Sequence, residues 1–178
     1  MRQLMLIGMM FLTGCVQQSN TIHTADQVLF DPRLIGEWKT IEGSPKFTFD
    51  IRRFPQDDST YHVIVRDQRG NGMISEVNAR LANVDGKRYL TVANVDHEQH
   101  PKFSTIVVDE LEPNLKVRVL NPGWLHRAIE ADPAIISHQG TAKKKFVVTA
   151  TTEELLGFYQ KQLPNDDPWT RFVLAREK

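Results

Sequence analysis

The chain has 178 residues, of which 40% are hydrophobic and 25% are charged, so its size and composition suit one globular domain. The 22 Lys and Arg residues balance the 22 Asp and Glu residues, and this zero net charge argues against nucleic acid as a partner. Cys15 is the one cysteine, so no intramolecular disulfide can form and the domain depends on its core.

The first fourteen residues have the pattern of a secretory signal peptide. A positive residue, Arg2, precedes a mostly apolar run over residues 4–12. A transmembrane helix needs roughly 20 apolar residues, so this run is too short to span a bilayer permanently. The segment Leu12-Thr13-Gly14-Cys15 resembles the lipobox of bacterial lipoproteins, which has Leu three places before the cysteine and a small residue directly before it. The resemblance implies cleavage between Gly14 and Cys15 and attachment of lipid to the Cys15 thiol.

The residue after the cysteine bears on the membrane that such a lipoprotein reaches. By the sorting rule of enteric-type bacteria, an Asp there retains the protein at the inner membrane, and this chain has Val16. The resemblance therefore implies a lipid anchor in the outer membrane, with the domain facing the periplasm. Residues 15–29 are polar and are predicted to be a lipidated, flexible tether to a domain over residues 30–178. The alternative is an ordered N-terminal arm packed across the domain.

Hydrophobic residues alternate with polar ones along much of the domain, which predicts strands with one buried face. Phe47, Phe49 and Ile51 show the pattern, and Asn71-Gly72 and Asp85-Gly86 are typical of tight hairpin turns. The predicted strands, after a first one entered at residue 36, cover residues 46–52, 61–66, 73–84, 89–93, 103–111, 115–120, 143–150 and 169–175. Such short, evenly spaced strands are typical of an antiparallel barrel or sandwich.

Two stretches have helical spacing instead. Residues 122–131 follow Asn121, a suitable N-cap, and place Pro122 in the first turn. The second helix begins with a capping box formed by Thr151 and Glu154 and ends before Pro164. We therefore expect one short helix inserted among the strands and one amphipathic helix towards the C-terminus.

The segment Gly36-Glu37-Trp38 at the start of the strands resembles the Gly-x-Trp motif of the lipocalin and wider calycin families. The resemblance implies a mainly β, antiparallel, lipocalin-like barrel of about eight strands, in which Trp38 plugs the closed end. It also matches the strand over residues 145–150 to the last barrel strand, which a helix follows in lipocalins. Those families stack an arginine on the tryptophan from near the end of that strand, and residues 148–151 contain none. The general layout also resembles small bacterial lipoproteins without an assigned activity.

Two sets of residues are candidates for a site. The aromatic residues Phe47, Phe49, Tyr61 and Tyr89 are predicted to line a ligand cavity if the barrel is open, or to fill its core if it is closed. His97 and His100, with a neighbouring carboxylate, could bind zinc, or could belong to a solvated loop.

The sequence lacks a Gly-x-Ser-x-Gly nucleophile elbow and a phosphate-binding glycine loop, so we expect a non-enzymatic protein without a cofactor. The leading hypothesis is an anchored envelope lipoprotein that binds a small apolar or amphipathic ligand. The alternative is a lipoprotein with a filled barrel that docks on another envelope protein. A hydrolase or metal enzyme that uses the histidine loop is the third hypothesis.

Overall fold

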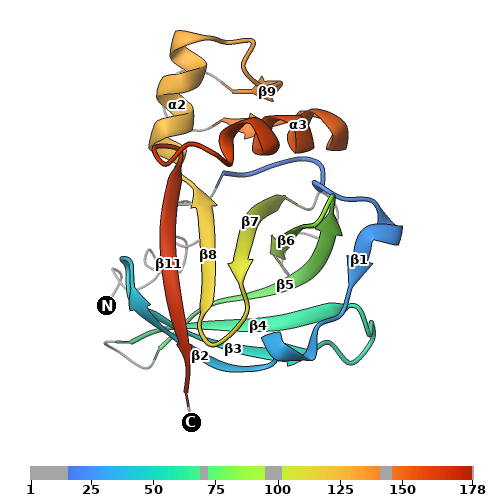
Figure 1. The fold of residues 1–178 in the computed structure, drawn as a ribbon, viewed down its shortest axis with the longest axis vertical. Helices are drawn as coiled ribbons and strands as arrows, with labels where there is room; N and C mark the ends of the chain where they lie inside the picture. The colour runs from blue at the N-terminus through green and yellow to red at the C-terminus, as the bar shows by residue number, and fades with distance from the viewer. Residues whose placement is uncertain (1–15, 69–71, 95–101, 141–145, 178) are drawn as a thin grey trace, which may run out of the picture.

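The computed structural model describes residues 16–68, 72–94, 102–140 and 146–177. It is mainly β, with one nine-stranded antiparallel sheet. The short strand β1 (Val28–Leu29) pairs with β5 at Leu81 and Ala82, just past the residues of β5 that pair with β4. The other eight strands form a lipocalin-like barrel (Figure 1). They are β2 (Gly36–Glu42), β3 (Phe47–Arg53), β4 (Thr60–Asp67), β5 (Met73–Val84), β6 (Lys87–Asn94), β7 (Phe103–Glu110), β8 (Leu115–Leu120) and β11 (Trp169–Arg176).

The barrel is closed because its last strand pairs on both sides. Strands β2 to β8 follow one another as an antiparallel meander, and β11 then pairs with both β8 and β2. A closed sheet has no free edge, so neither end of the meander exposes unpaired backbone groups. The predicted antiparallel barrel is confirmed, and the alternative of a sandwich is excluded.

The alternation along each strand separates two hydrophobic cores. On β5, Val77, Ala79 and Leu81 face the lumen, where they pack with Trp38 in the core of the barrel. The next residue, Ala82, faces the outer wall and belongs to a second core that the segment between β8 and β11 covers. Both faces of this part of the wall are therefore buried, and the predicted alternation on β5 is confirmed.

The segment between β8 and β11 forms a cap against the outer wall (Figure 1). It contains α2 (Pro122–Ala131), β9 (His138–Gln139), β10 (Val147–Val148) and α3 (Thr152–Gln162). Both predicted N-caps are present: Asn121 accepts hydrogen bonds from two backbone N–H groups, and Thr151 and Glu154 form the capping box. The helices of the described residues are too short or too polar to cross a membrane.

The predicted strand over residues 143–150 is corrected by the structure. In the part that is described, only Val147–Val148 is extended, and it pairs with β9 outside the barrel. The eighth barrel strand is β11, which comes after α3 instead of before it. The strand-then-helix order taken from the lipocalin resemblance is therefore wrong for this chain, although the closed barrel is present.

The prediction of a flexible tether over residues 15–29 is also wrong for the described residues from 16 onward. The alternative of an ordered arm agrees with the structure, because Val16 is 5% exposed and Ile22 is fully buried. After these residues, η2 (Ala25–Gln27), β1 and η3 (Pro32–Leu34) lead the chain to β2. His23 is 6% exposed, and its burial lowers the pKa of the imidazole, which favours the neutral form.

Gln18 fixes the arm in place, and its side chain is fully buried. Its backbone N–H and C=O bond to Phe103 on β7, and it bridges to Val148 of the cap on its other side. Its side-chain amide donates to the Tyr159 hydroxyl at 3.0 Å and accepts from the Thr105 hydroxyl at 2.8 Å. One residue therefore joins the barrel wall, the arm and helix α3.

We predict that Gln18→Ala lowers the free energy of unfolding by about 3 kcal/mol, because it leaves the buried Thr105 and Tyr159 hydroxyls without these bonds. Chemical denaturation followed by circular dichroism measures the change. The matched control is Gln17→Ala at the partly exposed neighbour, which should stay within about 0.5 kcal/mol of the parent. Equal effects of the two substitutions would contradict the proposed part of Gln18.

Candidate functional site

The two ends of the barrel are built differently, and the end at which β2 begins is plugged. Trp38 is 1% exposed, and its indole N–H donates to the Leu34 carbonyl at 2.9 Å. The guanidinium of Arg176, on the last strand, lies 4.6 Å from the centre of the indole. It also donates to the backbone carbonyls of Arg33 and Ile35. This end is called the closed end below.

Arg176 is the arginine beside Trp38 that the lipocalin resemblance implies and that residues 148–151 do not contain. It lies on β11 because β11, and not the strand that ends near residue 150, is the last strand of the barrel. The same contact explains the glycine of the motif: Gly36 has φ +132°, and a Cβ atom there would lie 2.8 Å from the Arg176 guanidinium. The Trp38 plug that the resemblance implies is therefore present, with its arginine on β11.

Tyr61 belongs to the closed end as well. Its hydroxyl accepts from the Asp31 backbone N–H at 2.6 Å, and its ring stacks on Phe30 with a centroid distance of 5.1 Å. The side chain is fully buried, and burial raises the pKa of the phenol. Tyr61 thus ties the N-terminal segment over the plug and faces no open space.

The opposite end, here called the loop end, is where β2 ends, β5 and β7 begin and β8 ends. Phe47 and Phe49 lie towards this end, with ring centroids 6.4 Å apart, and both pack in the lumen core. Phe49 is partly exposed. That these two residues contact a ligand stays a prediction.

The lumen is not uniformly buried. Leu90, Ile106 and Val119 are direct cross-strand neighbours on β6, β7 and β8, and each is partly exposed. They share a face with the fully buried Leu81, which is the partner of Leu90, so this face is the lumen. Other partly exposed apolar residues on the same face are Val92, Val117 and Phe172. Side chains in a close-packed core lose nearly all their exposure, so this half of the wall is not fully covered by close-packed side chains.

Tyr89 lies outside the lumen, which corrects its prediction as a cavity residue. It faces the outer wall beneath α3, where it is fully buried and contacts Tyr159 edge-on with ring centroids 6.3 Å apart. The alternation on β6 could not distinguish the two faces, because Tyr89 and Leu90 are both apolar and both faces are covered. The lumen residue there is Leu90.

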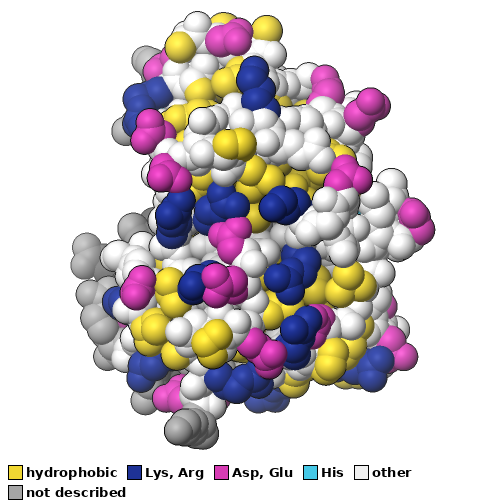
Figure 2. All heavy atoms as spheres, viewed as in Figure 1, with side chains coloured by type: hydrophobic (Ala, Val, Ile, Leu, Met, Phe, Trp, Pro, Cys, Tyr) yellow, Lys and Arg dark blue, Asp and Glu magenta, His cyan; other side chains and the backbone are white. Residues whose placement is uncertain are grey.

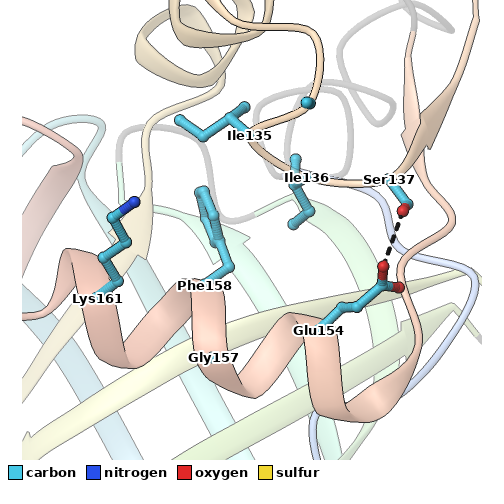
Figure 3. Close-up of a pocket in the computed structure, with 8 residues that line it drawn as sticks. Ile135, Ile136, Ser137, Glu154, Gly157, Phe158 and Lys161 are labelled. Carbon is cyan, nitrogen blue, oxygen red and sulfur yellow. Dashed lines mark hydrogen bonds between the residues drawn. The ribbon is translucent and has the colours of Figure 1, made fainter.

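A separate, small hollow lies in the cap, with a volume of about 280 Å³. Figure 3 shows Phe158 of α3 pointing towards Ile135 and Ile136, with Glu154 hydrogen-bonded to Ser137 at one end. The pKa of Glu154 is lowered mainly by its bond from the Thr151 backbone, which is the capping-box bond. Its carboxylate is therefore used to cap the helix, and the other ionisable side chain that lines the hollow is Lys161.

The proposed metal ligands His97 and His100 lie outside the described residues, as do Gly14 and Cys15. In the parts of the chain that are described, no group of three or more His, Cys, Asp or Glu side chains could hold a metal ion. No family model, curated protein or solved structure matches this chain. The barrel lumen is therefore the candidate site on physical grounds alone.

We predict that Arg176→Ala lowers the free energy of unfolding by about 1–2 kcal/mol, because it removes the stacked cation and two backbone bonds at the closed end. Thermal or chemical denaturation measures the loss. The control is Arg171→Ala on the same strand, where an exposed ion pair with Asp166 should contribute little. A loss no larger than that of the control would mean that Arg176 does not hold the plug.

Proposed function

We propose that this protein is an envelope lipoprotein, anchored through Cys15 to the outer membrane and facing the periplasm, whose barrel binds a small apolar or amphipathic ligand without catalysis. The observation that supports ligand binding is the partly exposed apolar wall formed by Leu90, Ile106 and Val119. Ligand pockets are concave and mostly apolar, with few polar groups, and this wall has that character.

The form of the lumen favours entry from the loop end. Trp38 and Arg176 fill the closed end, so a ligand cannot pass there. The cap covers the outer wall of β5 to β7, where Ala82, Tyr89 and Val107 contribute to its core. A ligand that reaches the lumen must therefore enter past the residues that border the loop end.

The alternative function, docking on another envelope protein, needs an extended apolar surface. Among the described residues, the exposed large hydrophobic side chains are Ile41 and Met73. Figure 2 shows hydrophobic atoms interspersed with Lys, Arg, Asp and Glu side chains on the face that it displays. These observations favour ligand binding over docking.

Filling the lumen tests the binding proposal. We predict that Ile106→Trp reduces binding of the apolar fluorophore N-phenyl-1-naphthylamine at least several-fold, because the indole would occupy the space beside Leu90 and Val119. Fluorescence titration of the purified protein measures the binding. The matched control is Ile64→Trp on the outer face of β4, which is also partly exposed and should bind as the parent does.

The stability of the same variants gives a second readout. If the lumen has space, the free energy of unfolding of Ile106→Trp should lie within about 1 kcal/mol of that of Ile64→Trp. Overpacking a filled core would instead lower it by about 1–3 kcal/mol. A destabilised Ile106→Trp together with a parent protein that binds no fluorophore would contradict the ligand-binding proposal and favour docking.

The anchor is tested separately. Cys15→Ala should move the protein from the membrane fraction to the soluble fraction of the envelope, and mass spectrometry of the parent should show a diacylglyceryl-modified N-terminal cysteine. Several acyl chains hold a protein at a membrane firmly, so we expect little parent protein in the soluble fraction. An unmodified Cys15, or a variant that still sediments with membranes, would contradict the anchor.

A further inference from the structure

The chain leaves no spacer between the proposed anchor and the folded domain. Val16 is 5% exposed, and its carbonyl accepts a hydrogen bond from the Ser104 hydroxyl. Consecutive Cα atoms are about 3.8 Å apart, and Val16 directly follows Cys15 in the sequence, so no spacer residue separates the proposed lipidation site from the ordered domain. A flexible tether over residues 15–29 would instead give a root-mean-square reach of about 20 Å. A lipid on Cys15 therefore holds the domain against the bilayer.

The point of attachment is the loop end of the barrel. Gln18 pairs with Phe103, the first residue of β7, and takes the place next to β7 that lies beyond the end of β8. Figure 1 shows the described chain beginning beside the tip of β8, far from the end of β11 at which the C-terminus lies. The described chain thus begins at the end of the barrel opposite to the Trp38 plug.

Two partly exposed aromatic side chains flank the arm, and two exposed apolar side chains lie elsewhere on the loop end. Phe103 flanks the arm on one side, and on the other is Phe146, two residues before the arm's partner Val148; both phenylalanines are partly exposed. Ile41 and Met73, the two exposed large hydrophobics noted above, lie near the end of β2 and at the start of β5, and so also border the loop end. Exposed apolar groups that surround a lipid anchor can enter the interfacial region of a bilayer, where their burial is favourable.

We propose that the loop end of the barrel rests directly on the phospholipid bilayer, so that the lumen exchanges a membrane-dissolved amphiphile with that bilayer. This inference rests on the proposed lipidation of Cys15 and on the proposed binding in the lumen, and it adds the orientation and the source of the ligand. The start of the ordered arm and the exposed apolar residues Ile41 and Met73 lie at the same end of the barrel, which favours a bilayer over a protein as the surface that covers this end.

The orientation can be measured on the mature, lipidated protein in vesicles of phosphatidylethanolamine and phosphatidylglycerol. Two single-cysteine variants, Lys102→Cys and Lys87→Cys, each receive an environment-sensitive fluorophore, because the lipidated Cys15 cannot react. Lys102 is exposed beside Phe103 at the loop end, and Lys87 is exposed in the hairpin between β5 and β6 at the closed end. Lys87 lies about 20 Å away along the strand direction, by the rise of a β-strand.

We expect lipids with a headgroup quencher to quench the label at residue 102 several-fold more strongly than the label at residue 87. Equal quenching at both positions would mean that the barrel lies on its side, and no quenching at either would mean that the domain stands away from the bilayer. Either result would overturn the proposed orientation. Protection of residue 102 only after an envelope protein is added would likewise overturn it in favour of a protein partner.

A spacer variant tests the exchange. Inserting a flexible Gly-Ser segment of about 14 residues between Cys15 and Val16 restores a reach of about 20 Å. We expect the rate of transfer of a pyrene-labelled fatty acid from vesicle to protein to fall several-fold, with equilibrium binding of the fluorophore unchanged. An unchanged rate would overturn direct exchange. Loss of binding in the unmodified protein would instead refute the lumen proposal, and failure to associate with vesicles would refute the anchor, so the three failures are distinguishable.

Discussion

The structure depends on β11, which is the last strand in the sequence and the one that closes the barrel. Without it, β2 and β8 would be free edges of a seven-stranded meander, and such edges invite pairing with other chains. At the closed end, Arg176 of β11 contacts Trp38. At the loop end, the indole N–H of Trp169, also on β11, donates to the Gln162 carbonyl on α3. The closed end and the cap are therefore both held by one strand.

The position of the cap follows from this closure. After β8 the chain must return to place β11 beside it. The segment between these two strands forms the cap, which packs on the outer wall. Arg118 on β8 joins the two parts, because it donates to the Leu163 carbonyl and lies 5.3 Å from the Trp169 ring. The arm then fits between β7 and β10, where Gln18 bonds to polar groups on β7 and α3 and its neighbours Gln17 and Ser19 bond to Val148 on β10. The cap thus buries part of the outer wall, at Ala82, Tyr89 and Val107, whereas the barrel itself is closed by β11.

Local elements were predictable from the sequence where the pattern is carried by neighbouring residues. The bounds predicted for residues 73–84, 115–120 and 122–131 agree with β5, β8 and α2, because alternation, helical spacing and capping are local signals. Partners are not local. Val147–Val148 and β11 are both extended, and alternation could not show which of them pairs with β2. Arg176 was missed for that reason, since its contact with Trp38 depends on the pairing of β11 with β2.

The candidate site was harder to predict than the fold. Gln18 lies in a polar segment whose composition is typical of a flexible linker. Its burial depends on Thr105 and Tyr159, which are distant in the sequence. Likewise, the sequence predicts burial for both Tyr89 and Leu90. Only the assembled structure shows that Tyr89 faces the cap and Leu90 faces the lumen. The aromatic residues singled out from the sequence belong mostly to packed regions. The partly exposed wall is instead aliphatic, formed by Leu90, Ile106 and Val119, and its exposure depends on how the strands close the barrel.

The two ends of the barrel differ in structure, and the arm begins at the loop end. A plugged end stabilised by Trp38, Arg176 and Tyr61 can tolerate water outside it, because its polar groups are bonded to the backbone. The loop end is bordered by exposed apolar side chains, which water does not stabilise. In the proposed lipoprotein, the acyl chains on Cys15 supply firm membrane binding, so these few side chains need to contribute only a preferred orientation. In the proposed lipoprotein, an arm that is ordered from Val16 onward holds the anchor in a fixed position relative to the barrel, whereas a flexible segment would leave it free.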